Sequence, residues 1–204
     1  MSWNKYFIIV TDVERKELHE LVDMTGYGKT LISFEKINFR IASNKNYEGI
    51  GFGLYENNFW IISADQTEKF FNDEPSVLEK NLCKRFPNKT IIALAENGTV
   101  DAFGFNLIVN GNRVRVISGC DGEYGYEFGE PIEIELTNLK NVQAEIDSSE
   151  KEEIIAAEGE RGFSDYVKFE SLWRTPFDLL TEKIGKTIDQ IYQDNPEFEI
   201  FKQK

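Results

Sequence analysis

One dipeptide near the middle of the chain constrains the fold most. Asn110-Gly111 is the pair preferred in a type I′ turn, where both residues need a positive φ angle, and it stands between two β-rich segments. A two-residue turn puts Val109 opposite Asn112, Leu107 opposite Val114 and Phe105 opposite Val116. One face would then hold Phe103, Phe105, Leu107, Val109, Val114 and Val116, and the other Asn106, Ile108, Arg113 and Arg115. Because a single register sorts both strands, we predict an antiparallel hairpin here.

Helices are predicted where a Ser, Thr or Asp side chain can close a first turn. The first begins at Thr11 or Asp12 and ends near Gly26. Further starts are predicted at Asp65 with Glu68, Ser76 with Glu79, Ser149 with Glu152, and Thr175 with Pro176. The last helix would carry an apolar face of Phe177, Leu180, Ile184, Ile188 and Ile191. Residues 158–162, which contain two glycines, are predicted to form a mobile loop.

Strands are predicted at residues 5–11, which are apolar and β-rich, and at residues 131–136, which alternate strictly. A second hairpin covers residues 49–64, with Asn57-Asn58 as its turn and Tyr55 opposite Trp60. Residues 31–41 fit a strand or a helix. No repeat or linker divides the 204 residues, a length that suits one core. We predict a single α+β domain over residues 1–204, in which a mainly antiparallel sheet built from two β-hairpins is covered by several helices.

Charge is concentrated in one part of the chain, which we call the acidic sector. Residues 121–160 contain thirteen carboxylates and only two lysines, and they account for most of the net charge of −13 of the chain. Nucleic acids and anionic membranes bind clustered lysine and arginine, so we expect neither as a partner. The chain has no apolar run of membrane-spanning length and begins without a signal-peptide pattern. We therefore expect a cytoplasmic protein with free cysteines at Cys83 and Cys120.

Two glycine-rich segments suggest nucleotide binding but lack its context. Gly26-Tyr27-Gly28-Lys29-Thr30 ends like a phosphate-binding loop, yet Asp23 stands where the first glycine is required and a helix precedes the segment. Gly49-Ile50-Gly51-Phe52-Gly53 lies in a predicted strand and opens no helix. Glycines at alternate strand positions instead let a ring or helix pack closely on that face. We predict structural roles for both segments.

Metal, cofactor and cysteine chemistry receive little support. His19 is the only histidine, which rules out histidine metal clusters. The run from Asp121 to Glu127 breaks the calcium-loop pattern, because Gly125 replaces a ligand. The neighbours of Cys120 are acidic and would raise the pKa of its thiol. We expect no cofactor, no metal and no catalytic residue, and these expectations favour a protein that is not an enzyme without deciding the question.

The candidate site residues are the arginines of the central hairpin and the carboxylates that follow them. Arg113 and Arg115 would project from one face, where they either pair with carboxylates of the acidic sector or form a fork for an anionic ligand. The remaining candidates are Asp121, Glu123, Glu127 and Glu130. As a group they predict a partner-binding or ligand-binding surface around residues 113–130.

Five segments of the chain occur in the order Thr90-Ile-Ile-Ala-Leu-Ala, Thr99-Val-Asp-Ala-Phe-Gly-Phe-Asn-Leu, Asn110-Gly-Asn-Arg-Val-Arg115, Phe128-Gly-Glu-Pro-Ile132 and Phe177-Asp-Leu-Leu-Thr-Glu-Lys-Ile-Gly-Lys186. They resemble an uncharacterised family of bacterial proteins of about 200 residues, a domain of unknown function, in which a hairpin precedes a Gly-Glu-Pro segment and a C-terminal helix. The resemblance covers roughly residues 90–190. It implies a bacterial cytosolic α+β domain and no activity, cofactor or site residue.

Two functional hypotheses follow. The first is a non-enzymatic binding protein whose acidic sector docks a basic protein, since a patch of one sign speeds association and selects partners by charge. A toxin-neutralising immunity-type protein is one concrete form. The alternative is a small-ligand-binding protein or enzyme with a site between the sheet and the 120s loop, using Arg113, Arg115, Cys120 and nearby acids. A pocket in which the two arginines converge would favour the alternative.

Overall fold

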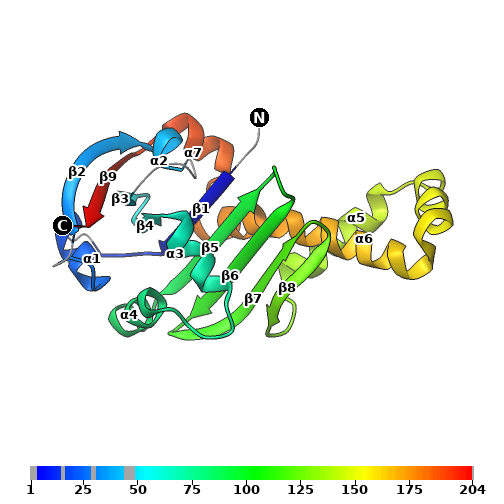
Figure 1. The fold of residues 1–204 in the computed structure, drawn as a ribbon, viewed down its shortest axis with the longest axis horizontal. Helices are drawn as coiled ribbons and strands as arrows, with labels where there is room; N and C mark the ends of the chain where they lie inside the picture. Colours follow the sequence, from blue (N-terminus) through cyan, green and yellow to red (C-terminus); the bar gives the residue numbers. More distant parts are fainter. Residues whose placement is uncertain (1–3, 15–16, 29–30, 44–48, 204) are drawn as a thin grey trace.

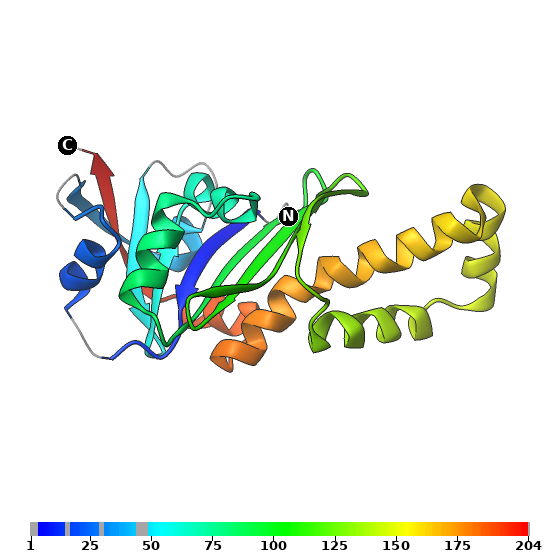
Figure 2. The same cartoon turned by 90° about the horizontal axis from the view of Figure 1, so that it is seen from below.

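The protein has three layers, with one antiparallel sheet between two groups of helices (Figures 1 and 2). The computed structural model describes residues 4–14, 17–28, 31–43 and 49–203. The predicted α+β class, mainly antiparallel with covering helices, is confirmed. Lys29 and Thr30, the last two residues of the segment that resembles a phosphate-binding loop, lie outside the described residues. Within the described part of the chain, no helix combines the length and apolar content needed to cross a membrane.

In the described residues, nine strands form one sheet in the order β2-β9-β3-β4-β1-β5-β6-β7-β8. Their bounds are β1 Asn4–Val10, β2 Leu31–Asn38, β3 Ile50–Tyr55, β4 Asn58–Ile62, β5 Thr90–Asn97, β6 Ala102–Val109, β7 Asn112–Cys120, β8 Glu123–Phe128 and β9 Glu197–Gln203. The C-terminal strand β9 lies between β2 and β3 and pairs with both, so the end of the chain joins two strands of its N-terminal part (Figure 1). Strand β8 forms one edge of the sheet.

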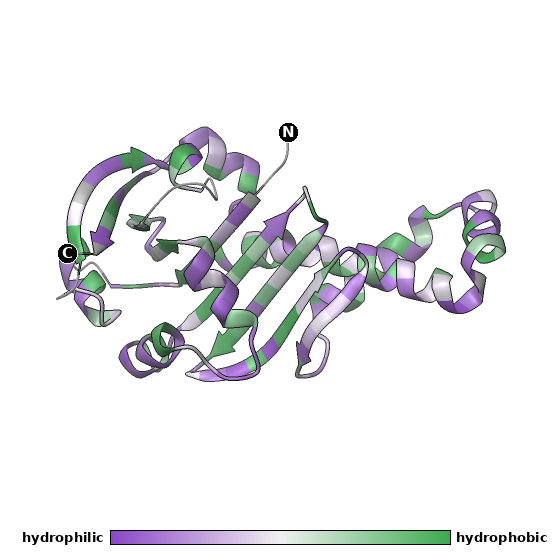
Figure 3. Cartoon of the chain, viewed as in Figure 1, coloured by the Kyte–Doolittle hydropathy of each residue, from purple (hydrophilic) through white to green (hydrophobic). Residues whose placement is uncertain are grey.

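The helices divide between the two faces of the sheet. Their bounds are α1 Leu18–Met24, α2 Phe39–Ala42, α3 Ala64–Glu68, the 3-10 helix η1 Lys69–Phe71, α4 Val77–Arg85, α5 Glu133–Glu145, α6 Ser148–Ile184 and α7 Ile188–Asp194. Leu21, Phe70 and Leu82 place α1, η1 and α4 in the core on one face. Phe39, Leu180 and Ile191 place α2, α6 and α7 in the core on the other. Hydrophobic residues accordingly recur along the strands, whereas the outer ends of α5 and α6 are largely hydrophilic (Figure 3).

The glycines of β3 have the structural role that the sequence predicts. A Cβ atom on Gly53 would lie 2.6 Å from the ring of Phe198, and one on Gly51 would lie 3.1 Å from Ile200. Only glycine lets the side chains of β9 lie this close to β3. The hairpin of β3 and β4 is also confirmed, but its turn comes one residue earlier than predicted, so each residue of β3 pairs two positions away from its predicted partner. Glu56 and Asn57 occupy the turn with φ angles of 49° and 58°, so Tyr55 faces Asn58.

The hairpin of β6 and β7 turns at Asn110-Gly111 as predicted, with Val109 opposite Asn112. The register beyond that pair is wrong, because a bulge at Val114 shifts it. Leu107 lies opposite Arg115, and Phe105 lies opposite Ile117. One inserted residue moves every later side chain of β7 to the other face. Val116 therefore belongs to the core beneath α4, and the side chain of Val114 is 39% exposed.

Several predicted starts of elements are wrong, and each has a local cause. Residues 131–136 do not form a strand, and α5 begins within them at Glu133. Glu135 accepts a hydrogen bond from the Ile132 N–H at 3.0 Å and closes the first turn of this helix. Asp147, not Ser149, caps α6 through bonds from the N–H groups of Ser149 and Glu150. Residues 158–162 are helical apart from a kink at Gly159.

The predicted helix start at Thr175-Pro176 lies inside α6. The hydroxyl of Thr175 donates to the Ser171 carbonyl at 2.9 Å. The helix crosses Pro176 because Leu172, Leu179 and Leu180 on either side are buried in the core, and that burial offsets the interruption of its hydrogen bonds. Ser63 replaces Asp65 as the cap of α3, and α1 begins only at Leu18, without a side-chain cap. The prediction of α4 with Ser76 as its cap is confirmed.

Candidate functional site

The acidic sector forms the β7–β8 turn, strand β8, helix α5 and the first part of α6. Helices α5 and α6 run side by side and extend together well beyond the sheet (Figure 2). We call residues 133–166, which end just before the buried Val167, the helical arm. The concentration of negative charge in residues 121–160 is visible in the sequence. That much of this charge lies on a projecting element is visible only in the fold (Figure 2).

Most carboxylates of the sector face solvent. Ten of the thirteen are exposed and form no ion pair with any described residue. These ten are Asp121, Glu123, Glu130, Glu133, Asp147, Glu150, Glu152, Glu153, Glu158 and Glu160. The other three pair with basic residues of the same chain. The sector therefore remains strongly negative after the internal ion pairs are taken into account.

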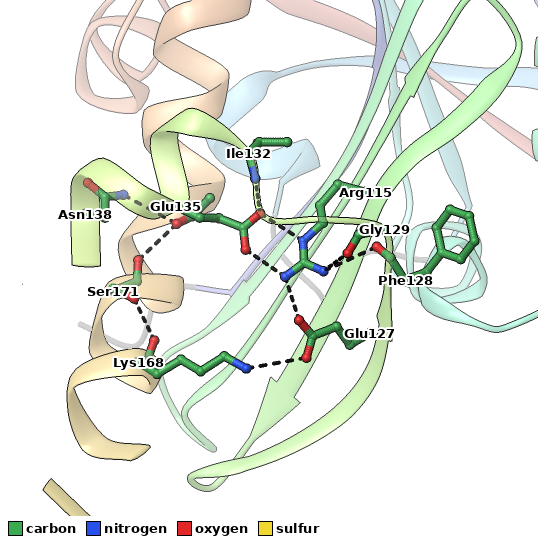
Figure 4. A network of polar contacts seen from close by, with 10 residues as sticks. Arg115, Glu127, Phe128, Gly129, Ile132, Glu135, Asn138, Lys168 and Ser171 are labelled. Atoms are coloured by element: carbon green, nitrogen blue, oxygen red, sulfur yellow. Dashed lines mark hydrogen bonds and ion pairs between the residues drawn. The ribbon is translucent and has the colours of Figure 1, made fainter. Parts of the chain in front are cut away.

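The root of the arm is held by Arg115, whose side chain is fully buried (Figure 4). Its Nε and Nη2 donate to the two carboxylate oxygens of Glu135 at 2.9 and 2.8 Å. Nη2 also donates to Glu127 at 2.8 Å, and Nη1 donates to the carbonyls of Phe128 and Gly129 at 3.3 and 2.6 Å. All five guanidinium N–H groups thus have acceptors. One side chain joins β7, β8 and the first turn of α5.

The network is electrically balanced. Lys168 of α6 donates to the second oxygen of Glu127 at 3.4 Å, so two cations face the two carboxylates of Glu127 and Glu135. Burial opposes ionisation of Arg115, but its hydrogen bonds to Glu135 and Glu127 outweigh this and raise the pKa of the guanidinium. Burial acts against the charged form of Glu127 as well, and the bonds from Arg115 and Lys168 lower the pKa of that carboxyl. The geometry indicates a clamp that fixes the arm to the sheet.

Arg113 lies on the opposite face from Arg115, so the predicted common face for the two arginines is wrong. Arg113 forms two bonds to Glu79 of α4, at 2.6 and 2.7 Å, and donates to the carbonyls of Asn72 and Asp73 at 2.8 Å. The bulge at Val114 separates the two side chains. Both arginines therefore fasten helical segments to the sheet, and they do not converge as a fork.

The other candidate residues lie at or near β8. Asp121 and Gly122 form the β7–β8 turn with φ angles of 51° and 79°. Glu123 begins β8, and Glu130 is exposed in the loop that leads to α5. Glu135 and Lys168 were missed as site residues. Glu135 stands three residues after Ile132 and could have been found as the first-turn acid of a helix, whereas no local signal pointed to Lys168.

A cavity of about 390 Å³ lies between η1 and the ends of β7 and β8. Cys120 and Glu123 line it, but Arg113 and Arg115 do not. The convergence of the two arginines in a pocket, which would have favoured the small-ligand alternative, is therefore not found among the described residues. Cys120 is exposed at the residue level. Desolvation is the main effect that raises the pKa of its thiol, and the acidic neighbours named from the sequence, Asp121 and Glu123, act in the same direction.

Residues set aside in the sequence analysis occupy surface or core positions. The side chain of His19 is 69% exposed, with Nε2 3.8 Å from Glu199. Cys83 is half-buried, and burial raises the pKa of its thiol. Among the described residues, no three metal-ligating side chains gather in one place.

Comparisons of this chain with protein-family models, with curated proteins and with solved structures return no match.

Proposed function

We propose that this chain is a non-enzymatic binding protein that docks a basic protein through the acidic sector. The observation that carries the proposal is the exposure of ten carboxylates on β8, its flanking loops and the projecting arm, none of which forms an ion pair with a described residue. An immunity-type protein that neutralises a basic toxin is one concrete form of such a function.

The construction of the arm supports this proposal. The clamp of Arg115, Glu135 and Glu127 holds its root in one position, so little order has to be gained when a partner binds. Exposed charges of one sign accelerate encounter and reject partners of the same sign. The apolar side chains Ile154, Ile155 and Phe163 are partly buried within the arm. Leu136 and Tyr166 are exposed near its root, so charge dominates the surface of the outer part of the arm.

The proposal is tested with two variants that have the same net charge but carry their charge reversals in different places. One variant carries Glu152, Glu153, Glu158 and Glu160 replaced by lysine, all exposed and beyond the first turn of α6. The matched control carries Glu14, Glu17, Glu74 and Glu182 replaced by lysine, all exposed outside the sector. Both variants gain the same positive charge, and circular dichroism checks that both are folded.

Binding is measured by fluorescence anisotropy with a short capped peptide that alternates lysine and alanine. Exposed ion pairs contribute about 0.2–1 kcal/mol each, so four reversals on the arm should weaken binding by about tenfold or more. The control variant should stay within about threefold of the wild type. An equal loss in both variants would mean that net charge alone attracts the peptide, and the proposed docking surface would be rejected.

A further inference from the structure

The cavity beside β8 has an aromatic floor and an acidic mouth. Tyr6 and Phe71, which are 5% and 8% exposed, line its inner part. Glu68 and Glu123, both exposed, line it nearer the surface. No lysine or arginine is among the described residues that line it. The cavity can therefore hold an organic cation, because aromatic rings attract cations and carboxylates neutralise them.

Further carboxylates lie close to the mouth of the cavity. The thiol of Cys120 also lines the cavity and donates to the Val100 carbonyl at 3.2 Å. Burial comes first among the causes that raise the pKa of this thiol, and Asp121, Asp101 and Glu123 act in the same direction. These three carboxylates favour a cation beside Cys120, whereas desolvation disfavours a charge of either sign.

We propose that this cavity receives a lysine or arginine side chain of the basic partner and serves as the anchor point of the complex. The inference rests on the proposed function and adds a specific subsite to it. A volume of about 390 Å³ lies at the lower end of ligand sites and suits one long side chain. Glu123 belongs both to the cavity and to the acidic sector, so a partner on the sector reaches the mouth. Buried anchors of this kind supply much of the affinity in protein interfaces.

The test uses Nα-acetyl-arginine methylamide as the probe, with the citrulline analogue as an uncharged control of nearly the same shape. Backbone amide NMR shifts are followed for residues 118–125 of the intact chain. The arginine probe should shift these signals and bind about fivefold or more tightly than the citrulline probe. Equal binding of both probes, or shifts confined to other residues, would overturn the proposal.

Two protein changes sharpen the result. Glu123→Gln should weaken the arginine probe by about threefold or more, whereas Glu130→Gln, at an exposed carboxylate after β8, should not. Alkylation of the exposed Cys120 with iodoacetamide should block the probe and weaken the lysine peptide as well. If peptide binding is weakened by the arm reversals but is unchanged by the alkylation, the anchor is refuted and the proposed function stands. If the arm reversals leave peptide binding unchanged, the proposed function falls instead.

Discussion

Removal of Glu135 should destabilise the protein strongly, because it leaves a buried guanidinium short of acceptors. In Glu135→Ala, Arg115 loses its two bonds at 2.9 and 2.8 Å while remaining fully buried. Loss of one partner from a buried ion pair costs about 3–5 kcal/mol. Glu127 keeps one bond, which favours the lower end of this range, and the Ile132 N–H loses its acceptor, which adds about 0.5–1 kcal/mol. We expect a loss of about 3–4 kcal/mol in the free energy of unfolding.

A double replacement separates the cost of an orphaned charge from the value of the pair. In Arg115→Met with Glu135→Leu, both buried charges of this pair are removed. Glu127 is 39% exposed and keeps Lys168, so water and this lysine can satisfy it. Apolar replacement of a whole buried pair is often nearly neutral. The double variant should therefore lie within about 1–2 kcal/mol of the wild type and be more stable than Glu135→Ala.

The assay is equilibrium urea unfolding followed by tryptophan fluorescence and circular dichroism, with the slope of the free energy compared between variants. Glu133→Ala is the control, since Glu133 is an exposed acid in the same first turn, and it should cost less than about 1 kcal/mol. A loss below about 1 kcal/mol for Glu135→Ala, or a double variant less stable than this single one, would refute the clamp.

Two further predictions concern other parts of the fold. Burial raises the pKa of the Glu96 carboxyl to about 7, against a smaller opposite effect of Lys5. The folded state therefore favours the protonated carboxyl. The wild type should lose this contribution to stability as pH rises from about 4.5 to about 7. Glu96→Gln should remove this part of the pH dependence. At pH 8 it should be more stable than the wild type by about 1–2 kcal/mol, after allowance for solvent screening at a partly exposed side chain. Parallel stability curves for the two proteins, measured by urea unfolding at several pH values, would contradict this prediction. Gly53→Ala should cost about 1–3 kcal/mol because its Cβ would lie 2.6 Å from the Phe198 ring. Addition of Phe198→Leu should make the effect of Gly53→Ala smaller, and strict additivity in thermal or urea unfolding would show that the ring is not the obstacle.

The sequence predicted features that depend on a few neighbouring residues. Asn110-Gly111 specifies its turn through the φ angles of two residues, and Ser76 caps α4 through one side chain. The alternate glycines of β3 also indicated the close packing that Phe198 provides. Each of these interactions is local, or is imposed by the absence of a side chain.

Features that depend on distant partners could not be predicted in this way. The alternation of residues in β7 is compatible with a regular strand and with a bulge at Val114. The bulge is stabilised by the hydrogen bonds that Arg115 makes to acceptors near β8 and in α5. Residues 131–136 alternate like a strand but become helical because Glu135 closes the turn. Strand β9 and the passage of α6 through Pro176 depend on packing against segments far away in the sequence. The candidate carboxylates Asp121, Glu123, Glu127 and Glu130 do lie on or next to β8, but the separate roles of Arg113 and Arg115 could not be predicted from their spacing.

The proposed function rests on negative charge that stays available on residues 121–160. The most direct measurement is hydrogen–deuterium exchange of the chain alone and saturated with the lysine–alanine peptide at physiological salt. The proposal predicts slower exchange in β8, the loop that follows it and the helical arm, with the remaining segments unchanged. Protection confined to other elements, such as β2 or α4, with residues 121–160 unaffected, would contradict it.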